Sequence, residues 1–193
     1  MIAALASRHA ALAARREAFL NALEGLPADV LARAPAPGAW SLAQLAEHLY
    51  RVEEQVVAGA ERARARPSSR GLPALPRLRA AVLRAVLRLP VRIPAPRGAG
   101  AVLPSDAPDM PAVAAAWRAL DARRERAFGT MDAAWLRRPA FRHPLLGLMP
   151  PHDALAFAAQ HFDHHVAQLR RTLEAVAPVH AARAEPVARA AHG

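Results

Sequence analysis

Three histidines fall within five consecutive positions of one short stretch, "QHFDHHVAQLRR" at 160–171, which contains His161, His164 and His165. Neutral imidazole is the commonest protein ligand for divalent transition metals. The chain has 9 histidines and no cysteine, so such a site here must be built from histidine, carboxylates and water. The chemistry therefore depends on which imidazoles can meet at one ion.

The direction of each imidazole follows from helical geometry, at about 100° per residue. With Phe162 on the apolar stripe set at zero, His165 lies about 60° and His161 about 100° to the same side. His164 lies about 160° away, so we expect it to face solvent. His161 and His165 thus form an i, i+4 pair on the flank of the buried face, close enough to share one metal ion.

A third imidazole can come from another helix. His48 lies about 60° from the apolar stripe around Leu45, on the helix predicted at 41–66. We therefore predict a metal site formed by His48, His161 and His165, with open coordination positions as in catalytic sites. Glu53, near the edge of this stripe, is a candidate acceptor that orients an imidazole. The alternative is that these are ordinary boundary histidines, because the spacing HxxxH also arises by chance.

Four long amphipathic segments must position these side chains, at about 2–26, 41–66, 109–131 and 151–176. Ser41 and Asp109 are suitable N-caps for the second and third segments. The pattern predicts an all-α fold, a four-helix bundle over 1–177. A Pro/Arg-rich insertion at about 67–108 separates helices two and three, and we expect a flexible C-terminal tail at 178–193.

Two stretches resemble the DinB/YfiT-like family of metal-dependent enzymes. "PGAWSLAQLAEHLYRVE" is similar to the segment that enters the second helix of that family, and "HPLLGLMPPHDALAFAAQHFDHHVAQLRR" is similar to its turn and last helix. The resemblance implies an up-down-down-up bundle with zinc or nickel held by His48, His161 and His165. It also implies that Trp40 packs at the entry to the second helix, and that Gln168 hydrogen-bonds near the site.

The family's activities suggest two reaction classes for this chain, hydrolysis and transfer of a small thiol. The metal would activate water or a low-molecular-weight thiol for attack on a small-molecule substrate. The sequence does not place a catalytic carboxylate, so the catalytic residues stay unknown. The alternatives are a non-catalytic bundle that binds a metal or ligand, and a basic module that acts through its insertion.

The formal net charge of +10 raises the possibility of a nucleic-acid partner. Every basic residue is arginine, alanine is abundant and aromatic residues make up only 5%, so compositional bias is the better explanation. No apolar run is long enough to span a bilayer, and we expect a cytoplasmic protein. The basic amphipathic stretch at 77–89 could contact a membrane surface, cover the bundle or form a homodimer contact.

Two arginines and two further histidines lie at unexpected places. Arg16 and Arg124 each fall about 20° from a core stripe, where an unpaired charge is costly. A buried ion pair with Asp121 is the favoured interpretation, and the lining of an anion-binding pocket is the alternative. His143, in a turn before the last helix, and His9, in the first helix, are interpreted as histidines outside the metal site.

Overall fold

The structure is a computed structural model that describes residues 3–65, 99–143 and 147–192. The longer helices are α1 (Ala3–Leu23), α3 (Leu42–Ala65), α5 (Met110–Gly129), α6 (Pro151–Val176) and α7 (Ala184–His192). The shorter elements are α2 (Ala28–Ala32), the 3₁₀ helices η1 (Ala99–Val102), η2 (Ala133–Arg137) and η3 (Pro178–Arg183), and the strands β1 (Phe141–His143) and β2 (Gly147–Met149).

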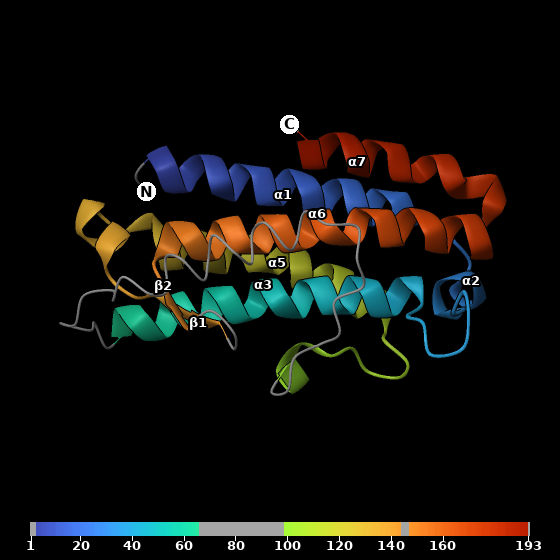
Figure 1. The fold of residues 1–193 in the computed structure, drawn as a ribbon, viewed down its shortest axis with the longest axis horizontal. Helices are drawn as coiled ribbons and strands as arrows, with labels where there is room; N and C mark the ends of the chain where they lie inside the picture. The colour runs from blue at the N-terminus through green and yellow to red at the C-terminus, as the bar shows by residue number, and fades with distance from the viewer. Residues whose placement is uncertain (1–2, 66–98, 144–146, 193) are drawn as a thin grey trace.

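The helices α1, α3, α5 and α6 form a bundle with nearly aligned axes (Figure 1). In this view α1 and α6 run from left to right, whereas α3 and α5 run in the opposite direction. This is the up-down-down-up order, and the prediction of an all-α four-helix bundle is confirmed. In this order α3 and α5 are parallel neighbours.

The core lies where the four predicted apolar stripes meet. Phe19 of α1 contacts Trp117 of α5 and Phe162 of α6, with ring centroids 5.8 Å apart in both pairs. Leu45 and Leu155, which mark the stripes of α3 and α6, are fully buried. Since the stripes point where the periodicity indicates, side chains on their flanks face the seams between helices.

The helix starts agree with their sequence signals. The Ser41 hydroxyl accepts a hydrogen bond from the backbone N–H of Gln44 at 3.2 Å, and the Gln44 side chain accepts one from the Ser41 N–H at 3.0 Å. This reciprocal capping box fixes the first turn of α3. Asp109 caps α5 by accepting a hydrogen bond from the N–H of Ala112.

The sequence did not predict the antiparallel hairpin of β1 and β2, which precedes α6. It packs against α3 at Gly59, where an added Cβ would lie 3.0 Å from the carbonyl oxygen of Ala140. Only glycine allows so close an approach without displacing the hairpin backbone. Gly147 adopts a φ of 75° at the start of β2, a conformation that disfavours other residues.

The C-terminal segment differs from the flexible tail that we expected at 178–193. It folds into η3 and α7, and α7 packs along α1 and α6 (Figure 1). Val187 and Ala184 are buried in this contact. The alanine-rich composition that resembled a loose tail instead allows close helix packing.

Most of the predicted insertion at about 67–108, including the amphipathic stretch at 77–89, lies outside the described residues. Its described end, from η1 onwards, contacts α3. Within the described ranges, no helix combines the length and apolar character needed to cross a bilayer.

Candidate metal centre

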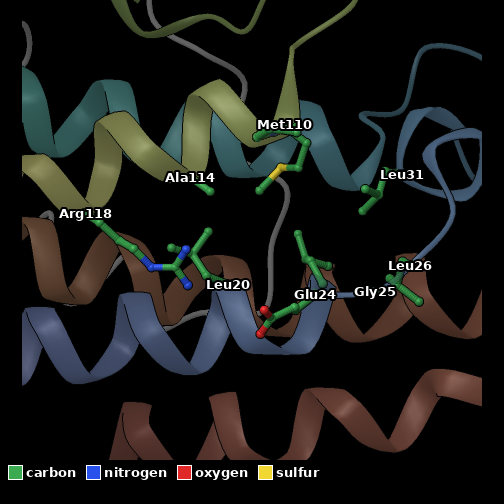
Figure 2. Close-up of a pocket in the computed structure, with 10 residues that line it drawn as sticks. Leu20, Glu24, Gly25, Leu26, Leu31, Met110, Ala114 and Arg118 are labelled. Atoms are coloured by element: carbon green, nitrogen blue, oxygen red, sulfur yellow. The ribbon is translucent and has the colours of Figure 1, made fainter.

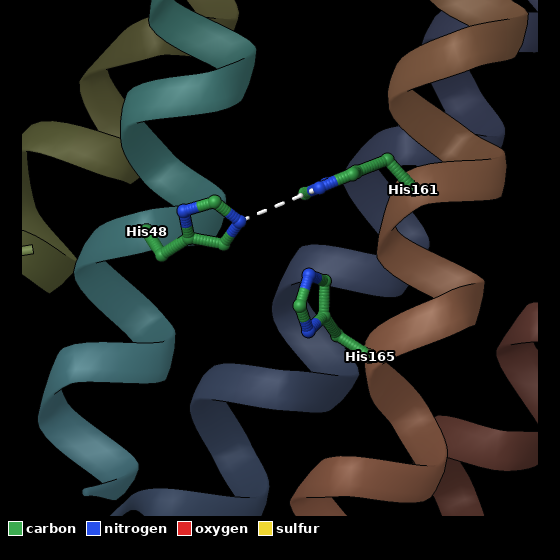
Figure 3. Close-up of side chains that lie close together, drawn as sticks. All are labelled: His48, His161 and His165. Carbon is green, nitrogen blue, oxygen red and sulfur yellow. Dashed lines mark hydrogen bonds between the residues drawn. The ribbon is translucent and has the colours of Figure 1, made fainter. Parts of the chain in front are cut away.

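Two antiparallel helices bring the three predicted histidines together. His48 lies in the second turn of α3, and His161 and His165 lie one turn apart on α6. Figure 3 shows the three imidazoles pointing into the seam between these helices. The flank positions inferred from the helical angles thus face one another across the α3–α6 contact.

The spacing of the ring nitrogens matches one shared ion. One ligand nitrogen from each of the three histidines lies within 4.8 Å of the other two. Nε2 of His48 and Nε2 of His161 are 3.4 Å apart. Bonds of 2.0–2.1 Å in a tetrahedral arrangement would place two nitrogens about 3.4 Å apart. The group therefore fits a divalent metal without a large movement of either helix.

Hydrogen bonds on the far side of two rings direct Nε2 toward the site. His48 Nδ1 lies 2.7 Å from the carbonyl oxygen of Val102, and His165 Nδ1 lies 2.8 Å from Oε1 of Gln168. A carbonyl oxygen can only accept, so Nδ1 of His48 carries the proton and Nε2 keeps its lone pair. Partners of this kind orient metal-binding histidines in many proteins. Gln168 thus has the place that the resemblance implied.

Burial keeps these imidazoles in the neutral form that binds metals. It lowers the pKa of His48, although the hydrogen bond to Val102 acts in the opposite direction. It lowers the pKa of His165 to about 3, assisted by the charge of His48. The pKa of His161 is held well below its usual value by burial and then by the neighbouring histidines. At neutral pH all three rings offer lone pairs rather than positive charges.

Aromatic rings flank the histidine group on two sides. The ring centroid of Trp40 lies 4.7 Å from that of His48 and 6.4 Å from that of His165. Phe157 lies 5.6 Å from His161 on α6. These contacts restrict the rotation of the imidazoles, and Trp40 has the packing role that the resemblance implied.

The other histidines considered from the sequence lie outside the group. His164 is adjacent to His165, with ring centroids 5.3 Å apart, but does not join the three ligand nitrogens. His143 is buried on β1 against Phe157, and burial lowers its pKa to about 4. His9 lies beside the charges of Asp121 and Arg124 on the other side of the bundle.

Arg16 and Arg124 form a second buried polar group, with Asp121 and Glu53. Arg124 Nη1 lies 2.7 Å from Oε2 of Glu53, and Arg16 Nη1 lies 2.7 Å from Oδ1 of Asp121. Arg124 also pairs with Asp121. We call these four residues the ion-pair cluster. Two cations face two anions, so the structure favours the ion-pair interpretation over an anion-binding pocket.

Glu53 differs from its predicted role as an acceptor for an imidazole. Its carboxylate is buried and engages Arg124, on the α5 side of α3. The acceptor for His48 is instead the carbonyl of Val102, more than fifty residues away in the sequence. Sequence periodicity cannot reveal that acceptor, because a backbone carbonyl has no residue signature and its placement depends on a loop.

An apolar groove of about 360 Å³ lies elsewhere, between the end of α1, α2 and the start of α5 (Figure 2). Leu20, Leu31 and Met110 line it, and Glu24 and Arg118 supply charge. None of the three clustered histidines borders it, so this groove is separate from the candidate metal centre.

Of the comparisons with known proteins, one identifies the family of this chain. Searches of curated proteins and of solved structures find no match to this chain. The family model of the DinB superfamily matches residues 11–169, a range that includes all three histidines and the four bundle helices up to most of α6. The chain therefore belongs to the DinB superfamily.

Proposed function

We propose that this protein is a metal-dependent enzyme in which His48, His161 and His165 hold one divalent ion, zinc or nickel. The observation that supports this proposal is the convergence of three ligand nitrogens within 4.8 Å of one another on two separate helices. Three neutral ligands leave the charge of the ion uncompensated and leave coordination positions for other molecules.

When bound, such an ion acts as a Lewis acid and lowers the pKa of a coordinated water or small thiol. The protein residues supply position and environment. The carbonyl of Val102 and the side-chain oxygen of Gln168 accept hydrogen bonds from Nδ1 of His48 and of His165, which keeps both Nε2 atoms directed inward. Trp40 packs over two of the rings and limits their exchange with solvent.

The proposed substrate is a small molecule with an electrophilic centre, attacked by water or by a low-molecular-weight thiol as cosubstrate. The three grouped residues are all histidines and include no carboxylate that could act as a general base. Metal coordination alone can activate water or a thiol at neutral pH. These nucleophiles therefore fit a site without a general base.

Elemental analysis of protein purified without a polyhistidine tag tests the metal. We expect close to one zinc or nickel ion per chain, and loss of that ion in His161→Ala. His164→Ala is the matched control, because His164 is in the same helical turn but outside the three ligand nitrogens. Equal metal content in His161→Ala and wild type would contradict the assigned site.

Turnover separates an enzyme from a bundle that binds metal without catalysis. The metal-loaded protein should hydrolyse an activated ester or transfer a small thiol to an electrophile, and the metal-free protein and His161→Ala should not. A protein that holds the ion tightly but turns over neither substrate class would favour the non-catalytic alternative.

A further inference from the structure

The face of α3 that carries His48 also carries three other polar side chains, Gln44, Glu47 and Arg51. With His48 they have the spacing i, i+3, i+4 and i+7, so all four lie on one side of the helix. Each of them hydrogen-bonds to residues 102–105, a segment that begins at the last residue of η1. We call residues 102–105 the strap, and it crosses this face of α3.

Glu47 makes two of the five hydrogen bonds between α3 and the strap, more than any other residue of this face. Its Oε2 accepts hydrogen bonds from the backbone N–H of Ser105 at 2.6 Å and from the Ser105 hydroxyl at 2.8 Å. Its Oε1 accepts one from Arg51 at 2.7 Å, and Arg51 in turn donates to the carbonyl of Leu103 at 2.7 Å. The strap covers Glu47 so well that only 8% of the residue is exposed.

The strap supplies the carbonyl that orients His48. Val102 accepts from Nδ1 of His48 at 2.7 Å, three residues before the Ser105 that Glu47 holds. A three-residue connection transmits the position of Ser105 to Val102. Without it, the His48 ring could change tautomer or rotate, and Nε2 would no longer be the fixed ligand.

We propose that Glu47 is a positioning residue of the metal centre, acting through the strap and Val102 on His48. The proposal rests on the proposed metal site. Glu47 is not one of the three residues whose ligand nitrogens lie close together. Substitution of a residue that orients a metal ligand typically lowers metal affinity by about 10-fold to 100-fold.

Glu47→Gln tests the proposal, because it keeps the size of the side chain but replaces a carboxylate oxygen with an NH₂ group that cannot accept. Glu61→Gln is the matched control, since Glu61 is on the same helix and pairs with Arg123 at 2.8 Å, away from the strap. Zinc is titrated into each metal-free protein against a competing chelator. We expect zinc affinity to fall about 10-fold in Glu47→Gln and to change less than twofold in Glu61→Gln.

A second measurement needs no metal. Long-range ¹H–¹⁵N spectra of the metal-free proteins report the His48 tautomer, and we expect the Nδ1–H form to dominate in wild type and Glu61→Gln. In Glu47→Gln both tautomers should be populated. Should Glu47→Gln not fold, Ser105→Ala removes only the hydroxyl contact to Glu47, and the same two changes are expected in a weaker form.

The outcomes separate this inference from the proposed function. If wild-type protein binds neither zinc nor nickel, the proposed function fails and the inference fails with it. If wild type binds zinc and Glu47→Gln shows the same affinity and the same tautomer as Glu61→Gln, the metal site stands. Glu47 would then only fasten the strap, and the positioning role would be overturned.

Discussion

The bundle contains two buried polar groups that differ in how their atoms are satisfied. In the ion-pair cluster, the guanidinium groups of Arg16 and Arg124 face the carboxylates of Asp121 and Glu53, and the charges balance within the group. In the histidine group between α3 and α6, three neutral rings direct ring nitrogens toward one point and no charged side chain belongs to the group. Nε2 of His48 and Nε2 of His161, 3.4 Å apart, can share one proton in a hydrogen bond or bind one cation, and Nδ1 of His161 is buried without a hydrogen-bond partner among the described residues.

A structural polar group differs from a binding site in whether its own members balance its charges. A group that pairs its charges internally needs no ligand to balance them, although burial still raises the pKa of Glu53. In the histidine group, outside acceptors orient two of the rings, and one nitrogen from each ring lies near the other two. Such a group is compatible with metal binding. The following predictions test whether the two groups behave independently in this way.

The largest expected effect is on stability, from breaking the ion-pair cluster. Arg124→Met leaves the buried carboxylate of Glu53 without its partner, which lies at 2.7 Å in the wild type. Chemical denaturation should show a loss of about 3–5 kcal/mol in the free energy of unfolding. The double variant Arg124→Met/Glu53→Gln should recover a substantial part of that loss, because the buried charge is removed.

The metal content of Arg124→Met should stay unchanged although its stability falls. The folded fraction of Arg124→Met should still bind one ion per chain, because Arg124 is on α5, pairs with Glu53 and Asp121, and is not among the three grouped histidines. Loss of the metal in a folded Arg124→Met protein would show that the two groups are coupled and that the comparison fails.

A somewhat smaller effect should come from metal addition. Zinc at 100 times its dissociation constant should stabilise wild type by about 2.7 kcal/mol, since the ion binds the folded chain and not the unfolded one. His161→Ala should lose most of this stabilisation, and Arg124→Met should keep it. Thermal unfolding with and without added zinc measures all three proteins. Equal stabilisation of His161→Ala would mean that zinc binds somewhere else.

Much of this arrangement could be predicted from the sequence, and the reasons for the failures are physical. Helical periodicity placed His48, His161 and His165 on the flanks of apolar stripes, and the stripes point to the core as expected. Periodicity cannot reveal that Glu47 is buried, because the strap that covers it belongs to a distant part of the chain. The hairpin and α7 were missed because their short segments depend on tertiary contacts with α3 and α1 rather than on local pattern.

The pH dependence of the metal-free protein should separate the ion-pair cluster from His143, a buried histidine outside the histidine group. Burial lowers the pKa of His143 to about 4, so the unfolded chain takes up this proton first as pH falls below about 6.5. The stability contributed by the neutral ring is therefore complete above pH 6.5 and decreases as the pH falls to about 4. Between pH 8 and pH 5 the loss is about 2 kcal/mol for this histidine.

Within the ion-pair cluster, Asp121 should respond only in stronger acid, whereas burial raises the pKa of Glu53. Hydrogen bonds from Arg16 hold the pKa of Asp121 below its ordinary value of 3.8, in spite of its burial. Its stabilisation is present above pH 3.8 and is lost as pH falls through the lower folded-state pKa. The free energy of unfolding of His143→Asn should depend less steeply on pH between 6.5 and 4 than that of wild type. Below pH 3.8 the two proteins should show the same pH dependence. A difference between His143→Asn and wild type that appeared only below pH 3.8 would contradict the assignment of the first range to His143.

The smallest expected effect is spectroscopic, and it uses one tryptophan near each group. Trp40 lies against His48 and His165, with centroids 4.7 Å and 6.4 Å away, whereas Trp117 is buried in the core with Phe19 and Phe162. Nickel has a partly filled d shell and quenches a nearby indole at short range, whereas zinc, with its filled shell, does not.

Titration with nickel should therefore quench the fluorescence of wild type and of Trp117→Phe, and Trp40→Phe should lose more than half of that quenching. The affinity for nickel should change little in Trp40→Phe, because its packing role leaves the ligand nitrogens in place. Zinc should compete with nickel and restore the signal of wild type. If Trp117→Phe rather than Trp40→Phe abolished the quenching, the ion would bind beside the ion-pair cluster, and the contrast between the two polar groups would be reversed.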